Sequence, residues 1–545
     1  MDPLQVGAKV GMGLAVVLAG WFLYASTPRP REPIWALRKR LLFGLPIGTL
    51  LSAAAVAAFF CFVQGWWSHD ATLTLPFTSW SLRYPLGMAL APIAHQNLGH
   101  LVGNLAGFLI FGAIGEYVFG HFPSKRGATA FSRPWTNPYV RAFLVVPLVV
   151  YGVALLTSVF AWGPIIGFSG VVYAAVGFVL VRYPLLAVVG LVARELATTT
   201  FWAFRTPILT ASAGSSYGSP WWANVAVQIH LLGLLAGAAL GLWVIFHRDD
   251  DGPSPARLFV GTLLVASSLT LWALWWYTGP ESYKLYRGPG VVLLVVLAVL
   301  VAYAARIDRS PVAELGARQF AVALLVFPVL TMGAVAMPIN VTMGEADTAT
   351  PGETVTIEGY EIGYGESVPD PRFEPLNVTG LPSPDAPTAS GVIVANEDRH
   401  LWTTAVGAGA LKNSGKRTVA VGGLTWRDEV TVRRVGWRAI GGGSAFVVRA
   451  ATTDGAVTPL YESDPAVADA IVAGHRLAVI PVEGDFYLEA SAWGNNSIEA
   501  LPARAPVPEP GNETTLGNVT VGTARGTIWI LHEGTRVPAF RAGNA

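Results

Sequence analysis

The chain has 545 residues, of which 52% are hydrophobic and only 13% are charged. Soluble globular domains carry about 25% charged residues, so this composition excludes a chain that is soluble throughout and places most of it in lipid. The charge is uneven: residues 340–545 hold 24 acidic and 15 basic residues, whereas residues 1–339 hold 11 acidic and 21 basic residues. The sequence therefore predicts a basic membrane part and an acidic tail that is large enough for its own core.

Apolar runs account for the membrane part. A helix needs about 20 residues to cross about 30 Å of hydrocarbon. The predicted span 184–204 contains Arg194 and Glu195, and opposite charges inside a span are expected to face the helix bundle or a water-accessible edge of it. The predicted spans are 8–25, 41–64, 97–119, 142–162, 167–181, 184–204, 222–246, 257–277, 289–305 and 319–337.

The basic residues predict the orientation of these spans. The loops that follow the first, third, seventh and ninth runs are rich in Arg and Lys, which is typical of cytoplasmic loops. We therefore expect an integral protein of the cell membrane with about ten spans and both termini on the exterior.

Glycan acceptor motifs agree with this orientation, because none precedes residue 340. Asn340 carries the first motif and is expected to lie too close to the membrane to be modified. The remaining candidates for glycosylation are Asn377, Asn495, Asn512 and Asn518.

Short alternating runs separated by Gly, Pro and Asn dominate the chain from about residue 350. Such runs are typical of the strands of a β-sandwich. Examples are residues 354–358, 417–421, 445–449 and 526–531. The Pro-rich stretch 368–387 is expected to be a loop. Cys61 is the single cysteine in the sequence, so no disulfide can form within the chain. The tail must therefore be stabilised by its hydrophobic core alone.

Polar residues inside spans are costly and are therefore functional candidates. The first group lies at the outer end of the third run, where His100 and Asn104 are four residues apart and share a helix face, and His95 precedes them. Both His100 and Asn104 can donate hydrogen bonds into a cavity, as an oxyanion requires. The simpler interpretation is hydrogen bonding between helices.

The second group opens the fifth run. A helix over 167–181 covers about 22 Å at about 1.5 Å per residue, which is roughly 8 Å less than the hydrocarbon thickness. Ser169 should therefore lie below the outer surface, at a helix N-terminus whose free N–H groups favour negative charge. The small residues Gly170, Ala174 and Gly177 would equally suit a simple packing motif.

The third group is His230 with a glycine every fourth residue after it, at Gly233, Gly237 and Gly241. Small faces on the fifth and seventh runs would let these helices touch. His230 could then act as general base to the weak nucleophile Ser169. A histidine bonded to a neighbouring helix is again the simpler interpretation.

Together these motifs resemble those of the rhomboid intramembrane proteases, over about residues 41–246. The resemblance rests on the spacing of His95, His100 and Asn104, on the Gly167-Phe168-Ser169-Gly170 motif with Tyr173, and on His230 with its spaced glycines. Gly115-Glu116 with Gly120 also resembles the family pattern. The chain departs from it where Trp80 and Arg83, adjacent in many members, are separated by two residues.

The resemblance implies a serine endopeptidase that cleaves single-span membrane proteins near the outer face. It implies a catalytic dyad of Ser169 and His230, with Tyr173 packed against the histidine. It also implies an oxyanion site formed by His100, Asn104 and the Ser169 N–H, with His95 and Gly167 in support. No cofactor, metal or nucleic-acid partner is expected.

The predicted spans, the charge distribution and the resemblance together divide the chain into four parts. These are an extra span with a basic loop (1–40), a rhomboid-like six-helix core (41–246), three additional spans (247–339) and an exterior all-β, sandwich-like domain (340–545). The expected fold is thus a polytopic all-α membrane bundle followed by a soluble β domain.

Three other functions fit parts of the pattern. The chain could be an inactive relative that acts as a receptor or scaffold through its exterior domain. His100 and His230 could ligate a haem iron, although Ser169 and Asn104 would then have no role. A zinc protease fits less well, since His95 and His100 lack the His-Glu-x-x-His arrangement.

Overall fold

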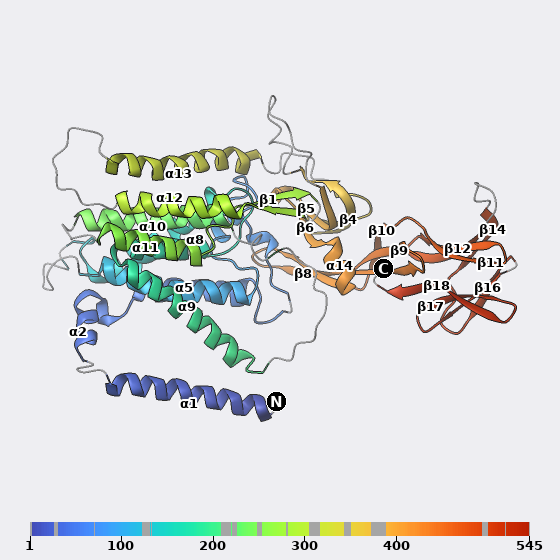
Figure 1. Cartoon of the computed structure of the whole chain (residues 1–545), viewed down its shortest axis with the longest axis horizontal. Coiled ribbons are helices and arrows are strands. Elements are labelled where there is room, and N and C mark those ends of the chain that lie inside the picture. Colours follow the sequence, from blue (N-terminus) through green and yellow to red (C-terminus); the bar gives the residue numbers. More distant parts are fainter. Residues whose placement is uncertain are drawn as a thin grey trace. The chain divides into compact units, whose positions relative to one another are not determined.

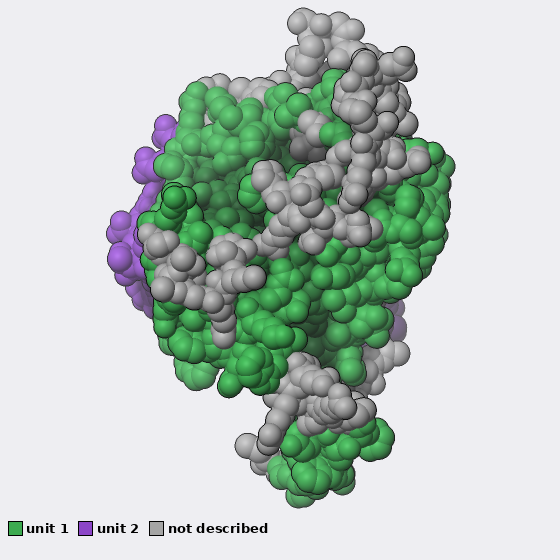
Figure 2. All heavy atoms as spheres, turned by 90° about the vertical axis from the view of Figure 1, so that its left-hand side faces the viewer, with its two compact units in different colours: residues 1–214, 220–276, 283–342 green, residues 215–219, 277–282, 343–545 purple. Residues whose placement is uncertain are grey.

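The computed structural model describes residues 3–26, 31–69, 71–122, 131, 133–208, 220, 226–247, 253–279, 282–304, 317–342, 350–371, 388–492, 500–517 and 519–543. The chain divides into two compact units (Figures 1 and 2). The first unit is helical and ends at Thr342, and the second consists chiefly of residues 343–545.

The first unit is a bundle of helices, and the axes of most of them are roughly aligned in Figure 1. Its α-helices are α1 (Pro3–Ser26), α2 (Arg31–Arg40), α3 (Ile47–Ala58), α4 (Pro85–Leu90), α5 (Leu98–Phe119), α6 (Pro138–Val140), α7 (Val146–Val159), α8 (Ser169–Arg182), α9 (Pro184–Arg205), α10 (Val227–His247), α11 (Pro255–Ser268), α12 (Arg287–Ala304) and α13 (Ala317–Thr342). Short 3₁₀ turns cover Leu42–Gly44 and Leu75–Phe77, and π-helical turns cover Phe59–Val63 and Arg141–Val145.

Six of the described helices are long and apolar enough to cross a membrane, which indicates a membrane protein. They are Pro3–Ser26, Leu98–Phe119, Pro138–Val159, Pro184–Arg205, Val227–Ile245 and Arg287–Ala304. Ile47–Val63, Ser169–Arg182 and Pro255–Ser268 are apolar but shorter.

The prediction of a span over 257–277 is wrong in its second half. Helix α11 ends at Ser268, and Thr270 has a positive φ of 62°, which a helix does not tolerate. Residues Trp275–Gly279 form strand β1, which pairs with β2 (Ser282–Leu285). Aromatic and β-branched residues fit a strand as well as a helix, so an apolar run alone did not distinguish them.

Glycines bring α8 and α10 into backbone contact. A Cβ at Gly233 would overlap the carbonyl oxygen of Gly170, and one at Gly237 would overlap that of Ala174. A Cβ at Gly177 would likewise overlap the carbonyl of Leu234 on α10. Because larger side chains would separate the two helices, the glycine repeat sets the distance between them.

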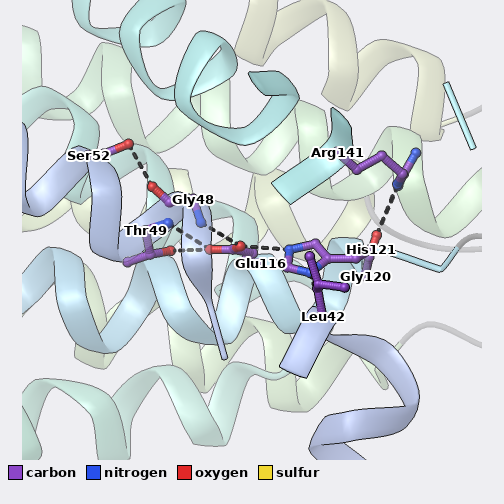
Figure 3. Close-up of polar contacts among 8 residues, drawn as sticks. All are labelled: Leu42, Gly48, Thr49, Ser52, Glu116, Gly120, His121 and Arg141. Carbon is purple, nitrogen blue, oxygen red and sulfur yellow. Dashed lines mark hydrogen bonds and ion pairs between the residues drawn. The ribbon is translucent and has the colours of Figure 1, made fainter. Parts of the chain in front are cut away.

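A buried carboxylate fixes the opposite end of the bundle (Figure 3). Glu116 on α5 is 3% exposed and accepts hydrogen bonds from the backbone N–H groups of Gly48 (2.9 Å) and Thr49 (2.7 Å). The Thr49 hydroxyl donates a third bond, at 2.7 Å. The carboxylate thus satisfies free N–H groups of the first turn of α3 and interacts favourably with the dipole of that helix.

His121 completes this cluster (Figure 3). Its Nδ1 accepts the N–H of Leu42 at 2.8 Å, so the proton of the ring must lie on Nε2, which donates to Glu116 at 2.7 Å. Next to it, the Arg141 guanidinium donates to the carbonyl of Gly120. The turn after α5 is therefore tied to α3 and to the segment that leads into α7.

The second unit is almost entirely β-structure. Its strands are β3 (Val355–Ile357), β4 (Tyr360–Pro369), β5 (Thr388–Asn396), β6 (Leu401–Gly407), β7 (Lys416–Gly422), β8 (Arg427–Ala439), β9 (Ser444–Ala451), β10 (Val457–Glu462), β11 (Ala466–Val472), β12 (His475–Val482), β13 (Asp485–Ala492), β14 (Ala500–Pro506), β15 (Glu513–Leu516), β16 (Val519–Ala524), β17 (Thr527–His532) and β18 (Thr535–Gly543). One short helix, α14 (Ala408–Ser414), which the sequence did not predict, follows β6.

These strands form three antiparallel sheets. Their orders are β3-β4-β5-β6, β11-β12-β13-β14 and β10-β9-β8-β18-β17-β16-β15, with β7 also paired to β8. A single apolar cluster draws residues from the last two sheets, including Leu477, Leu488, Ile528 and Phe540. The hydrophobic core of this part of the unit therefore lies between those sheets.

The four predicted strand examples are confirmed as β3, β7, β9 and β17. Two boundaries are corrected. Strand β4 extends to Pro369, two residues into the predicted loop, of which 372–387 lies outside the described residues. Helix α13 runs to Thr342, so Asn340 belongs to a helix and not to the β domain.

The contact between α8 and α10 can be tested with Gly237→Ala. The added methyl group would overlap the Ala174 carbonyl and force the helices apart, at a cost of about 1–3 kcal/mol. Thermal unfolding in detergent should show a lower midpoint. Gly152→Ala is the control, because a Cβ at Gly152 meets nothing within 4 Å. Equal midpoints for the two variants would contradict this packing.

Candidate active site

Ser169 and His230 lie side by side. Ser169 is the first residue of α8 and His230 is in the first turn of α10. The Nε2 of His230 is 2.9 Å from the Ser169 hydroxyl oxygen, and both side chains are half-buried. For Nε2 to accept the hydroxyl proton, the ring must carry its own proton on Nδ1. This pair can therefore transfer a proton from serine to histidine.

The ring of Tyr173 stacks on the imidazole of His230. Tyr173 is one helical turn after Ser169, and the two ring centroids are 4.0 Å apart with planes within 10°. The buried Nδ1 of His230 has no hydrogen-bond partner among the described residues. The Tyr173 hydroxyl donates to the carbonyl of Leu269 at 2.8 Å. The orientation of the histidine thus depends on ring stacking, and the stacked ring is fixed by the turn after α11.

His95, His100 and Asn104 form a second polar group. The amide nitrogen of Asn104 lies 3.0 Å from His95 Nε2, and the two imidazole centroids are 5.0 Å apart. His95 is fully buried before α5, and Asn104 is 6% exposed on that helix. One N–H of the Asn104 amide is used on His95, and the amide carries a second N–H that can donate elsewhere.

Gly167 joins the two groups. Its φ is +132°, which favours glycine, and a Cβ there would overlap the ring of His100. Its N–H donates to the Ala91 carbonyl at 2.9 Å. The backbone two residues before Ser169 therefore rests against His100. All seven site residues predicted from the sequence lie in this one region of the fold.

Gln64 is a site residue that the sequence analysis missed. Its amide oxygen accepts the N–H of His95 at 2.8 Å, and its amide nitrogen donates to the carbonyls of His95 and Leu73, both at 2.9 Å. The side chain is fully buried. A polar residue that ends a predicted span was the available signal.

The side chains of Arg194 and Glu195 lie in different surroundings. Arg194 on α9 faces α5, where its Nε donates to the carbonyl of Gly103 at 3.2 Å, whereas Glu195 is exposed. Of the glycosylation candidates, Asn512 is exposed, and Asn377, Asn495 and Asn518 lie outside the described residues. Asn340 is 1% exposed, with its amide nitrogen hydrogen-bonded.

No group of three or more His, Cys, Asp or Glu side chains that could hold a metal ion occurs among the described residues. No protein-family model, curated protein or solved structure matches the chain.

The bond from Tyr173 to Leu269 predicts a measurable effect on stability. Tyr173→Phe keeps the ring on His230 but leaves the buried carbonyl without its donor, which should cost about 1–3 kcal/mol in unfolding free energy. Tyr151→Phe is the control, because Tyr151 makes a similar bond to Ala89 at an exposed position. A larger loss in the control would contradict the role assigned to Tyr173.

Proposed function

We propose that this protein is an intramembrane serine endopeptidase of the rhomboid type, with its catalytic core in residues 41–246. The observation that carries the proposal is the 2.9 Å approach of His230 Nε2 to the Ser169 hydroxyl. A serine on its own is a weak nucleophile, and an adjacent general base is what activates it.

In the proposed reaction, Ser169 Oγ attacks the carbonyl carbon of the scissile peptide while His230 takes its proton. His230 then gives that proton to the leaving amine as the C–N bond breaks, and water hydrolyses the acyl-enzyme by the same steps in reverse. Tyr173 supplies the orientation that a carboxylate supplies in a triad, because it stacks on the imidazole.

The negative oxygen of the intermediate needs fixed donors in a site of low dielectric. The N-terminus of α8 begins at Ser169, so its backbone N–H groups and helix dipole favour negative charge there. His100 and the second N–H of Asn104 are the proposed side-chain donors. His95 orients Asn104 through their 3.0 Å contact.

The length of α8 and the positions of the basic loops support an exterior active site. Helix α8 has 14 residues, or about 21 Å, and a bilayer core of about 30 Å would leave one end of it below the surface. The basic loops predict that the Ser169 end faces outward. We therefore propose a cell-membrane protein with its termini, its active site and its β domain on the exterior, and single-span membrane proteins as substrates.

Two other functions have less support. A haem bound by His100 and His230 would need the Nε2 of His230, which faces Ser169. An inactive receptor would leave the approach of Ser169 and His230 without a purpose. A fluorophosphonate probe distinguishes the receptor from the enzyme, because it labels only an activated serine.

We expect Ser169→Ala and His230→Ala each to abolish cleavage of single-span reporter proteins in membranes. The double variant should be no worse than either single variant, because the pair acts as one unit. Matched controls are Ser52→Ala and His69→Ala, whose side chains bond to local backbone on α3 and in the loop after it. Substantial cleavage by Ser169→Ala would rule out the mechanism.

The substrate should be cut where its helix is already weak. Unwinding a helix in lipid leaves each exposed backbone group unsatisfied, at several kcal/mol. We expect substrates with exterior N-termini and with Gly, Pro or Ser in the outer third of the span, cut after a small residue near the outer face. Replacing those residues with Leu should protect the span without removing it from the membrane. Mass spectrometry of the products maps the cut, and cuts in the cytoplasmic third would contradict both the access route and the orientation.

A further inference from the structure

The last turn of α13 is hydrogen-bonded to the end of α7. The amide nitrogen of Asn340 donates to the carbonyl of Val159 at 2.9 Å and to that of Ala161 at 2.8 Å. Val159 ends α7, and the last carbonyls of a helix have no partner within it. Asn340 therefore caps α7 from a helix that lies more than 150 residues later in the sequence.

The backbone of Asn340 contacts a second segment. Its carbonyl, which is also near a helix end, accepts the N–H of Leu82 at 2.9 Å and the hydroxyl of Ser81 at 3.0 Å. Ser81 is fully buried and Asn340 is 1% exposed. One residue of α13 thus bridges the end of α7 and the loop that precedes α4.

The end of α7 and the loop before α4 both contribute to holding residues 159–167, the segment that leads into Ser169. Gln228, two residues before His230, accepts the N–H of Trp162 at 3.2 Å and donates to the Phe160 carbonyl at 2.8 Å. Ser79 exchanges hydrogen bonds with Ile165 through its own N–H (3.1 Å) and its hydroxyl (2.9 Å). Hydrogen bonds therefore hold the segment 159–167 at several points, and this segment leads directly to Ser169 beside His230.

We propose that Asn340 is a positioning residue for the Ser169 nucleophile, and that α13 supports the active site from outside it. This inference rests on the proposed protease function. Asn340 holds the segment 159–167 in two ways. It bonds directly to Val159 and Ala161 at the start of the segment. It also bonds to Ser81, which lies in the same loop as Ser79, the residue that bonds to Ile165. It touches neither Ser169 nor His230, so its effect is on their alignment.

Asn340→Asp tests the proposal. The side chain keeps its shape but loses both N–H donors. An ionised carboxylate would oppose the carbonyls of Val159 and Ala161, and a protonated carboxyl group can donate to only one of them. A displacement of the nucleophile by about 1 Å can cost roughly 100-fold in rate. We expect kcat to fall between about 10-fold and 100-fold with KM unchanged, and fluorophosphonate labelling of Ser169 to slow by a similar factor. Val341→Ala is the control, because Val341 is adjacent and 38% exposed.

A second variant covers the case in which Asn340→Asp does not fold, as judged by size-exclusion chromatography and thermal unfolding. Ser81→Ala removes only the hydroxyl that donates to the Asn340 carbonyl. We expect a severalfold loss of kcat, and little further loss when Ser81→Ala is added to Asn340→Asp, because the two hold the same segment. Labelling at the wild-type rate in Asn340→Asp, or in Ser81→Ala if that is the variant that folds, would overturn the proposal.

Hydrogen exchange separates this inference from the proposed function, because it needs no catalysis. In Asn340→Asp the peptide that covers residues 160–168 should exchange faster than in wild type, whereas the peptide around Glu116 should not change. Failure of the wild type to label with the probe, together with faster exchange in Asn340→Asp, would refute the protease function and leave Asn340 with a structural role only. Unchanged exchange in residues 160–168 would refute the role of Asn340, whether or not the wild type labels.

Discussion

The close approach of α8 and α10 is the constraint on which the rest of the site depends. At Gly233 and Gly237 the two backbones are so close that a methyl group would not fit. Water cannot drive helices together inside lipid, so close packing of small residues supplies much of the attraction. This separation lets Ser169 and His230 meet at 2.9 Å, and it lets Tyr173 stack on the histidine.

Two networks of buried polar side chains, one at each end of the bundle, hold their helices together. At one end, Glu116 accepts four hydrogen bonds and ties α5 to the start of α3. At the other end, Gln64 fixes the backbone of His95, which in turn contacts Asn104. An unsatisfied polar group is costly in such surroundings, so each of these networks fixes one relative position of its helices. In the proposed protease, the second network is the one that would orient the oxyanion donors.

Helices outside residues 41–246 contribute to this arrangement. The turn after α11 provides the carbonyl that fixes Tyr173, and α13 provides Asn340 at the end of α7. A division into a catalytic core at 41–246 and accessory spans at 247–339 therefore separates residues that are hydrogen-bonded to one another.

The sequence by itself predicted the apolar helices of membrane-spanning length, the all-β tail and the candidate site residues Ser169, His230, His95, His100 and Asn104. Spacing carries that information, because a repeat of four residues places side chains on one helix face and alternation places them on one strand face. The small faces on the fifth and seventh runs also predicted the contact between α8 and α10. Only the tertiary structure decided the contacts made by α13. Asn340 bonds to Ser81, 259 residues away in the sequence, and no local pattern specifies such a pair. It also decided that the apolar run 257–277 divides into a helix and a strand, because α11 ends at Ser268 and Thr270 takes a positive φ of 62°.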